Sequence, residues 1–171
     1  MPLRPPRRAV RVPSLTPRRR VGALLIAVLV SGCGTAARHR VPEDRLDRIR
    51  LLPPVAGTVS SGFGNRSGRR HAGIDILAPG GTEVRAASSG LASFAGSGMR
   101  GYGRAVILDH GEEIATLYGH LATIRVQSGE TVPGGAVIGT VGRSGNATTH
   151  HLHFELRVDG EAVDPIPYLN P

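Results

Sequence analysis

A chain of 171 residues has room for one domain of ordinary size and a tail, and too little for a second catalytic domain. Its net charge of +8 originates in the first 40 residues, which hold nine arginines and no acidic residue, so the other twelve arginines face all 13 acidic residues. The resulting balance of −1 after residue 40 excludes a basic domain that binds nucleic acid.

The first 32 residues have the pattern of an export signal, which is removed from a mature protein. A basic stretch ends at residues 18–20, and the apolar run of residues 21–30 follows it. Ten apolar residues are too few to span a bilayer, which needs about 20. We therefore expect residues 1–32 to direct the chain out of the cytoplasm, by an export route that the sequence leaves open.

Cys33 is the only cysteine of the chain and follows the small residues Ser31 and Gly32 directly. Small residues before a lone cysteine resemble the processing site of a bacterial lipoprotein, where the cysteine is lipidated and becomes the mature N-terminus. The alternative is a small residue without a special role beside an ordinary cleavage site. The lipoprotein hypothesis places the chain on the outer face of the cytoplasmic membrane or in the cell-wall space.

Residues 33–50 are polar and charged apart from scattered apolar side chains, and we expect them to tether the domain that follows. Pro42 and Glu43 suit the start of a helix, and Leu46 and Ile49 could share one face of a helical turn. A short helix and a flexible tether are equally compatible with this pattern. Residues 34–54 are also the candidate for a segment that regulates access to a site.

From residue 51 to residue 171, short alternating runs broken by glycine predict a single domain of strands. The runs follow one another at hairpin spacing, without the βαβ rhythm of a parallel sheet, so the predicted fold class is all-β, an antiparallel sheet or sandwich. Five segments have strand length and β-forming residues: 90–94, 104–109, 113–118, 136–141 and 151–158. Turns are expected at the glycine-containing stretches 79–81, 96–103, 110–111 and 133–135.

His71 and Asp75 are four residues apart, a spacing that fits two geometries of a metal site. On one extended strand, residues four apart point to the same face. On one helical turn they would also meet, as they do in helical zinc motifs. Gly73 weakens a helix, and Ile74 and Ile76 favour a strand, so we expect one extended strand here.

His151 and His153 are two residues apart and should point to one face of their predicted strand. Zinc in a catalytic site commonly takes three protein ligands from histidine and carboxylate and leaves a fourth place for water. A further histidine, such as His120, suits proton transfer or stabilisation of an oxyanion. Each residue taken singly could be an ordinary surface or turn side chain, and this is how we interpret His110 and His39.

Taken together, these spacings resemble one known family. The chain contains, in order, the segments SGFGNR (61–66), HAGID (71–75), GYG (101–103), YGHL (118–121) and HLHFE (151–155). The segments are similar to those of the lysostaphin and LytM type zinc endopeptidases. The similarity runs from about residue 55 to residue 157 and covers nearly the whole predicted domain.

The resemblance implies one zinc ion with His71, Asp75 and His153 as its ligands. It also implies that His120 and His151 form the catalytic pair. One of these two histidines would be the general base and the other would stabilise the oxyanion, in an order that the sequence leaves open.

The resemblance further implies a narrow groove in the β fold and hydrolysis of peptide bonds in peptidoglycan stems or cross-bridges. Asn65 and Arg66 lie in the family's entry motif, and we place them near the substrate groove without a fixed role. We expect a monomer that binds peptidoglycan peptide and is held to the membrane by its lipidated N-terminus. The alternative is a non-catalytic relative that regulates a cell-wall amidase. Such relatives usually lack metal ligands or catalytic histidines, and all five positions are filled here.

One departure from the family concerns the three residues before the His-Leu-His triplet. The family often has Thr-Gly-Pro there, whereas this chain has Thr-Thr-His at residues 148–150. His150 makes the register ambiguous, because a slip by one residue exchanges the two faces of a strand. The match to the family predicts that His151 and His153 face inward and that His150 points to the opposite face.

Overall fold

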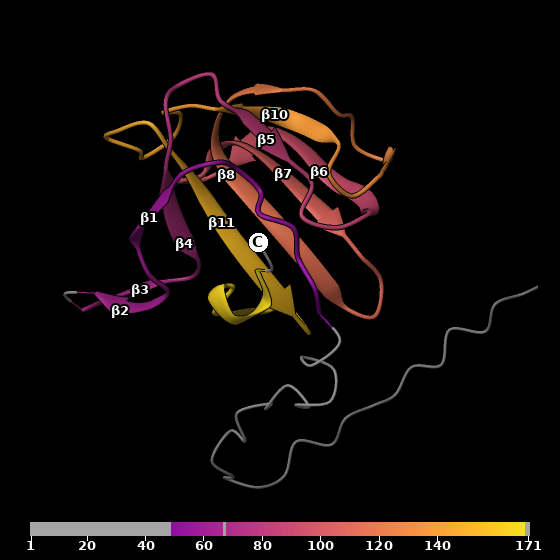
Figure 1. Ribbon diagram of the computed structural model, residues 1–171, viewed down its shortest axis with the longest axis horizontal. Helices are drawn as coiled ribbons and strands as arrows, with labels where there is room; N and C mark the ends of the chain where they lie inside the picture. The colour runs from indigo at the N-terminus through magenta and orange to yellow at the C-terminus, as the bar shows by residue number, and fades with distance from the viewer. Residues whose placement is uncertain (1–48, 67, 170–171) are drawn as a thin grey trace, which may run out of the picture. The chain divides into compact units, whose positions relative to one another are not determined.

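The computed structural model describes residues 49–66 and 68–169 (Figure 1). The predicted signal of residues 1–32, with Cys33 and the tether up to residue 48, lies outside this range. No helix in the described part is long and apolar enough to cross a membrane. The described residues belong to one compact unit.

This unit consists of short strands and one 3-10 helix. The strands are, in chain order, β1 (Thr58–Ser61), β2 (Gly64–Arg66), β3 (Arg69–His71), β4 (Ile74–Leu77), β5 (Glu83–Arg85), β6 (Gly90–Met99), β7 (Gly103–Asp109), β8 (Ile114–Ile124), β9 (Thr131–Val132), β10 (Val137–Val141), β11 (His151–Val158) and β12 (Glu161–Val163). The 3-10 helix η1 (Ile166–Tyr168) follows β12.

Ten of these strands form one antiparallel sheet with the order β1-β4-β11-β8-β7-β6-β9. Strand β10 pairs with both β5 and β8, and β12 pairs with β11. Strands β2 and β3 form a separate hairpin. The predicted all-β, antiparallel fold class is confirmed.

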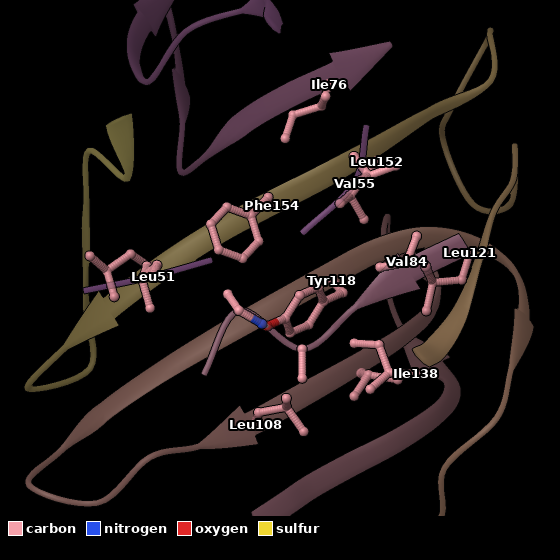
Figure 2. Packing of buried hydrophobic residues seen from close by; sticks show 14 of the residues in the cluster. Leu51, Val55, Ile76, Val84, Leu108, Tyr118, Leu121, Ile138, Leu152 and Phe154 are labelled. Atoms are coloured by element: carbon pink, nitrogen blue, oxygen red, sulfur yellow. The ribbon is translucent and has the colours of Figure 1, made fainter. Parts of the chain in front are cut away.

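Alternation along β11 gives the sheet two different faces. Leu152, Phe154, Leu156 and Val158 are fully buried on the core face, where burial of each large side chain contributes about 1.5–3 kcal/mol. Figure 2 shows Phe154 and Leu152 packed together with side chains from β7, β8, β5 and β10: Leu108, Tyr118, Val84 and Ile138. The residues between them on β11 point to the opposite face, which therefore remains available for a polar site.

The segment before β1 packs against this core. Ile49 and Leu51 are 5% and 2% exposed and belong to the same hydrophobic cluster as the sheet. The backbone N–H of Leu51 donates to the carbonyl of Tyr168 at 2.8 Å, and that of Leu52 donates to the carbonyl of Ala87 at 2.8 Å. The side chains of Ile49 and Leu51 and the backbone hydrogen bonds of Leu51 and Leu52 thus hold this segment against the core.

Two strands extend well beyond their predicted ends. Residues 96–103 were expected to form a turn, but β6 continues to Met99 and only residues 100–102 connect it to β7. Gly96 and Gly103 take part in the ladder between β6 and β7, whose register shifts between Gly96 and Met99. Strand β8 likewise continues beyond the predicted end at Tyr118 to Ile124. Pairing with neighbouring strands overrides the local preference of glycine for turns.

Candidate metal centre and groove

His71 and Asp75 lie on two strands, so the prediction of one extended strand is wrong. His71 is the last residue of β3, and Asp75 is the second residue of β4. Residues 72–73 change the direction of the chain between them. A Cβ atom at Gly73 would collide with the carbonyl oxygen of Phe154, so only glycine lets the chain approach β11 this closely. The ladder that follows pairs Asp75 directly with His153.

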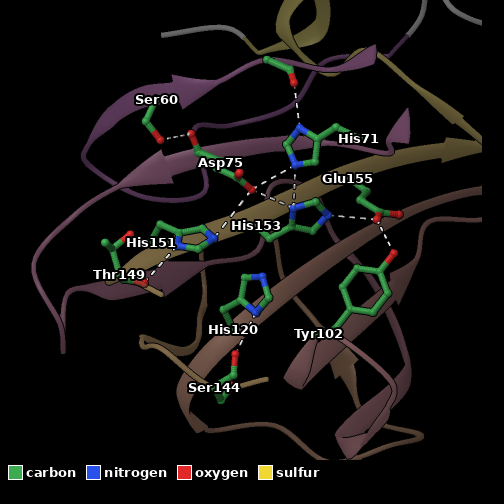
Figure 3. Close-up of polar contacts among 11 residues, drawn as sticks. Ser60, His71, Asp75, Tyr102, His120, Ser144, Thr149, His151, His153 and Glu155 are labelled. Carbon is green, nitrogen blue, oxygen red and sulfur yellow. Dashed lines mark hydrogen bonds and ion pairs between the residues drawn. The ribbon is translucent and has the colours of Figure 1, made fainter. Parts of the chain in front are cut away.

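Nitrogen and oxygen atoms of His71, Asp75 and His153 converge on one point (Figure 3). This point lies on the face of the sheet opposite the core, which is called the groove face below. His71 Nε2 is 3.1 Å from Asp75 Oδ1 and 3.2 Å from His153 Nδ1, and His153 Nδ1 is 2.9 Å from Asp75 Oδ1. Atoms that each bind a tetrahedral zinc ion at about 2.0–2.1 Å lie about 3.3 Å from one another. The donor types and their separations therefore fit one metal ion.

The other ring nitrogen of each histidine in this group is engaged elsewhere. His71 Nδ1–H donates to the carbonyl of Gly62 at 2.7 Å. His153 Nε2–H donates to Glu155 Oε1 at 3.0 Å. In the neutral form of each ring, these hydrogen bonds leave a lone pair on His71 Nε2 and His153 Nδ1, the two atoms that face Asp75.

His151 and His120 lie beside this group, with their rings 4.8 Å apart. His151 shares the groove face of β11 with His153, and its Nε2 is 3.7 Å from Asp75 Oδ1. Its Nδ1–H donates to the carbonyl of Thr149 at 3.0 Å. The Nδ1–H of His120 donates to the carbonyl of Ser144 at 2.9 Å. Each ring therefore keeps Nε2 for another partner.

His120 reaches the groove through a β-bulge. Between Tyr118 and Leu121, β8 has one residue more than the paired segment of β7 from Arg104 to Val106. His120 has a φ of 61°, a left-handed conformation that is unfavourable for a side chain with a Cβ atom. The extra residue lets Tyr118 and Leu121 both remain in the core while His120 turns away from it.

The groove around these residues has a volume of about 700 Å³. Besides the residues already described, its lining includes Arg70, Tyr102 and the segment before β11, residues 146–148. Arg70 pairs with Asn65 in the β2–β3 hairpin, and Asn65 is not part of the lining. The side chain of Arg66 lies outside the described residues, so its role in the groove stays a prediction.

Residues 69–165 match the family described as peptidase family M23. The chain belongs to this family. The matched range contains the three converging side chains and both neighbouring histidines, and it ends after β12.

Three proteins illustrate the similarity of this M23 chain to known ones. It is 42% identical over 129 residues to the DD-carboxypeptidase/endopeptidase Mpg of Neisseria meningitidis, which covers 72% of this chain and 30% of Mpg. It is 36% identical over 116 residues to the murein hydrolase activator NlpD of Salmonella typhimurium, which covers 68% of this chain and 30% of NlpD. The solved structure of the antimicrobial peptidase lysostaphin from Staphylococcus simulans superposes with a TM-score of 0.62 at 33% identity, over 66% of this chain and 49% of that one. The match thus spans about a third of the length of either curated relative.

The electrostatics of the M23 site favour a bound cation. Burial raises the pKa of Asp75, but the hydrogen bond from His153 and the charge of His71 outweigh burial and lower it to about 2. Burial lowers the pKa of His153, and its hydrogen bonds to Asp75 and Glu155 raise it by more. Since a metal ligand must be deprotonated, an ion and a proton would compete for Nδ1 of this histidine.

The histidine before the triplet is kept out of the site. His150 is exposed, and its ring lies so close to Gly80 that a Cβ atom there would be 2.7 Å from His150 Cδ2. His151 and His153 both face the groove, which is the register expected for them.

Glu155 and Tyr102 lie next to the converging side chains, although no role was predicted for either of them. Glu155 is fully buried on the groove face of β11, and Tyr102 lines the groove. A signal for Glu155 was present: it is an acidic residue inside the predicted strand of residues 151–158, two positions after His153. Tyr102 lies in the segment GYG (101–103) that contributes to the family resemblance, but only the fold brings the β6–β7 turn next to β11.

Proposed function

We propose that this chain is a zinc metalloendopeptidase that hydrolyses peptide bonds in peptidoglycan stems or cross-bridges. The observation that carries the proposal is the convergence of His71, Asp75 and His153 on the wall of an open groove, next to two further histidines. The similarity to Mpg, which is named as a carboxypeptidase and endopeptidase, and to the peptidase lysostaphin supports it.

In this proposal, His71, Asp75 and His153 hold the zinc ion. A zinc ion in such a site lowers the pKa of a bound water from about 15.7 to about 7 and polarises the carbonyl group of the substrate. Asp75 supplies the negative charge of the ligand set, and its low pKa keeps it ionised at any physiological pH. The residues around the site fix the directions of all three side chains.

His120 and His151 form the proposed catalytic pair. Both rings are held at Nδ1 by a backbone carbonyl, so both can offer Nε2 to a substrate in the groove. One Nε2 accepts a proton from the attacking water, and the other ring, which must carry a proton on both nitrogens for this role, donates Nε2–H to the developing oxyanion of the peptide. Burial lowers the pKa of His120, so its ring is neutral at pH 7 and able to accept a proton.

The proposal is tested with purified protein and isolated peptidoglycan. We expect one zinc ion per chain in elemental analysis, and release of peptide fragments that mass spectrometry identifies. A chelator should stop the release, and added zinc should restore it. Digestion that continues unchanged in chelator would rule out a metalloenzyme, and the masses of the fragments would identify the bond that is cut.

A second candidate function is favoured by the similarity to the murein hydrolase activator NlpD. In that case the chain would bind and activate a cell-wall amidase without hydrolysing peptide bonds itself. The complete set of metal-binding and neighbouring histidines argues for the peptidase. An amidase assay with and without this protein separates the two, since an activator raises amidase turnover while showing no peptide release of its own.

The proposed location is the outer face of the cytoplasmic membrane or the cell-wall space. Support comes from the basic and apolar pattern of residues 1–32 and from Cys33 directly after it. A monomer attached through a lipid at this cysteine would keep its groove within reach of peptidoglycan.

A further inference from the structure

Glu155 is a fully buried carboxylate whose two oxygen atoms are both occupied. Its Oε1 accepts the hydroxyl of Tyr102 at 2.6 Å and the Nε2–H of His153 at 3.0 Å. Its Oε2 accepts the Nε–H of Arg157 at 2.7 Å. A carboxylate taken out of water is costly unless it is paired in this way, so these three donors stabilise both the charge and the orientation of Glu155.

Strand geometry explains why Glu155 meets His153. The two residues are two positions apart on β11, so both side chains stand on the groove face. His153 points one ring nitrogen, Nδ1, toward Asp75 and the other, Nε2, toward Glu155 (Figure 3). A proton on Nε2 leaves the lone pair on Nδ1, which is the atom that a metal ion needs.

We propose that Glu155 is a positioning residue of the metal centre, which fixes the tautomer and the ring direction of His153 and is itself held in place by Tyr102 and Arg157. The inference rests on the proposed function only in assuming that a metal ion binds between His71, Asp75 and His153. In this arrangement Glu155 acts on the ion through His153.

Tyr102 links the groove wall to this carboxylate. Its hydroxyl is committed to Glu155, and its ring lies 5.5 Å from the ring of His153. Gly119 makes the approach possible, because a Cβ atom there would lie 3.2 Å from Tyr102 Cδ1 and 3.4 Å from His153 Cβ. The backbone carbonyl of Tyr102 also accepts the N–H of His120 at 2.8 Å. Tyr102 therefore acts on the site through Glu155 and the backbone.

The first test measures zinc affinity of the full chain by competition with a chromogenic chelator. Glu155→Gln keeps the size of the side chain but removes its charge and one acceptor for Arg157. We expect zinc to bind about 10- to 100-fold more weakly, which is the typical effect of removing a hydrogen-bond partner of a metal-binding histidine. Tyr102→Phe keeps the ring and removes one donor to Glu155, so we expect a smaller loss of the same sign.

Tyr118→Phe is the matched control for Tyr102→Phe. Tyr118 is fully buried on the core face of β8, where its hydroxyl accepts the N–H of Ala87 at 2.8 Å and the hydroxyl of Thr116 at 2.9 Å. The control should lower the melting temperature and leave zinc affinity of the folded protein unchanged. An equal loss of zinc affinity in Tyr102→Phe and Tyr118→Phe would mean general destabilisation and would overturn the inference.

A second measurement reads the tautomer of His153 directly. In the zinc-loaded chain, the Nε2–H proton of His153 should give a downfield, slowly exchanging NMR resonance, and Glu155→Gln should shift it upfield. Unchanged zinc affinity and an unchanged resonance in Glu155→Gln would overturn the inference. If Glu155→Gln does not fold, zinc affinity and the His153 resonance of Tyr102→Phe test the inference instead. A wild-type chain that binds zinc but digests no peptidoglycan would contradict the proposed peptidase and leave the role of Glu155 intact.

Discussion

At the scale of single residues, each histidine of the groove has one ring nitrogen anchored and the other directed at the site. His71, His120 and His151 donate Nδ1–H to backbone carbonyls, whereas His153 donates Nε2–H to the carboxylate of Glu155. The anchored nitrogen decides which tautomer the ring adopts. The proposed division into ligands and catalytic residues therefore depends on where the free nitrogen of each ring points.

This division predicts different outcomes for two alanine substitutions. His71→Ala removes a proposed ligand, so the protein should lose both its zinc and its activity. His151→Ala removes a proposed catalytic ring, so the protein should keep one zinc ion while its kcat falls by about 10²- to 10⁴-fold. Elemental analysis and the rate of peptide release from peptidoglycan check both.

His150→Ala is the control, because His150 is exposed, adjacent in sequence and outside the group of converging side chains. It should retain zinc and turnover. Loss of zinc in His151→Ala together with its retention in His153→Ala would show that the ligand assignment is wrong.

At the scale of secondary structure, the bulge in β8 places a histidine where a regular strand would place none. Regular alternation from Tyr118 would bury His120 in the core and turn Leu121 toward the groove. With the extra residue, Leu121 is buried in the core and His120 faces the groove. His120 must then adopt a left-handed φ of 61°. Strain of this kind is common where backbone geometry serves a functional site.

The strain at His120 can be measured by comparing two substitutions that both remove its ring. His120→Gly should be more stable than His120→Ala by about 1 kcal/mol, because glycine adopts a positive φ without penalty. Both variants should be equally impaired in peptide release. Denaturant unfolding of the two proteins gives the difference in free energy.

The same comparison at an ordinary position of β8 supplies the control. Ala115 is regularly paired with Arg157 and Asp109 on the two neighbouring strands and has no positive φ. Ala115→Gly should destabilise the protein by about 0.5–1 kcal/mol, since glycine in a strand interior loses more conformational freedom on folding. If His120→Gly is less stable than His120→Ala, the bulge stores no strain at this position.

At the scale of the whole described domain, the two faces of the sheet have different roles. The core face carries the packing with Leu51 and Val55 from the N-terminal segment, and the other face carries the groove. Within the predicted regulatory segment, residues 49–54 are described, and none of them lines the groove. A role for residues 34–48 in access to the site stays a prediction.

Attachment of the whole molecule to a membrane is predicted to depend on Cys33. Cys33→Ser removes the thiol that a lipid would modify, so the protein should move from the membrane fraction to the soluble fraction after cell lysis. Immunoblots of the two fractions measure this, with Ser31→Ala as a control that keeps the cysteine. Membrane association that persists in Cys33→Ser would refute lipid anchoring.

Much of the fold follows from local pattern. Alternation of apolar residues predicts the strands of residues 104–109 and 151–158 with their observed or nearly observed bounds. The stretch from His71 to Asp75 was misjudged because its break at residues 72–73 depends on contact with β11, which no local pattern contains. The expected turn at residues 96–103 was too long for the same reason, since residues 96–99 belong to β6 and pair with β7.

The sequence by itself determined the fold class, the shared strand face of His151 and His153, and which residue types could bind a metal, because these depend on periodicity and side-chain chemistry. Only the tertiary structure decided how His71 and Asp75 meet from two strands, how a bulge turns His120 into the groove, and that Glu155 receives Tyr102, His153 and Arg157. Each of these depends on a contact between segments far apart in the chain, and such contacts are formed by strand pairing and packing.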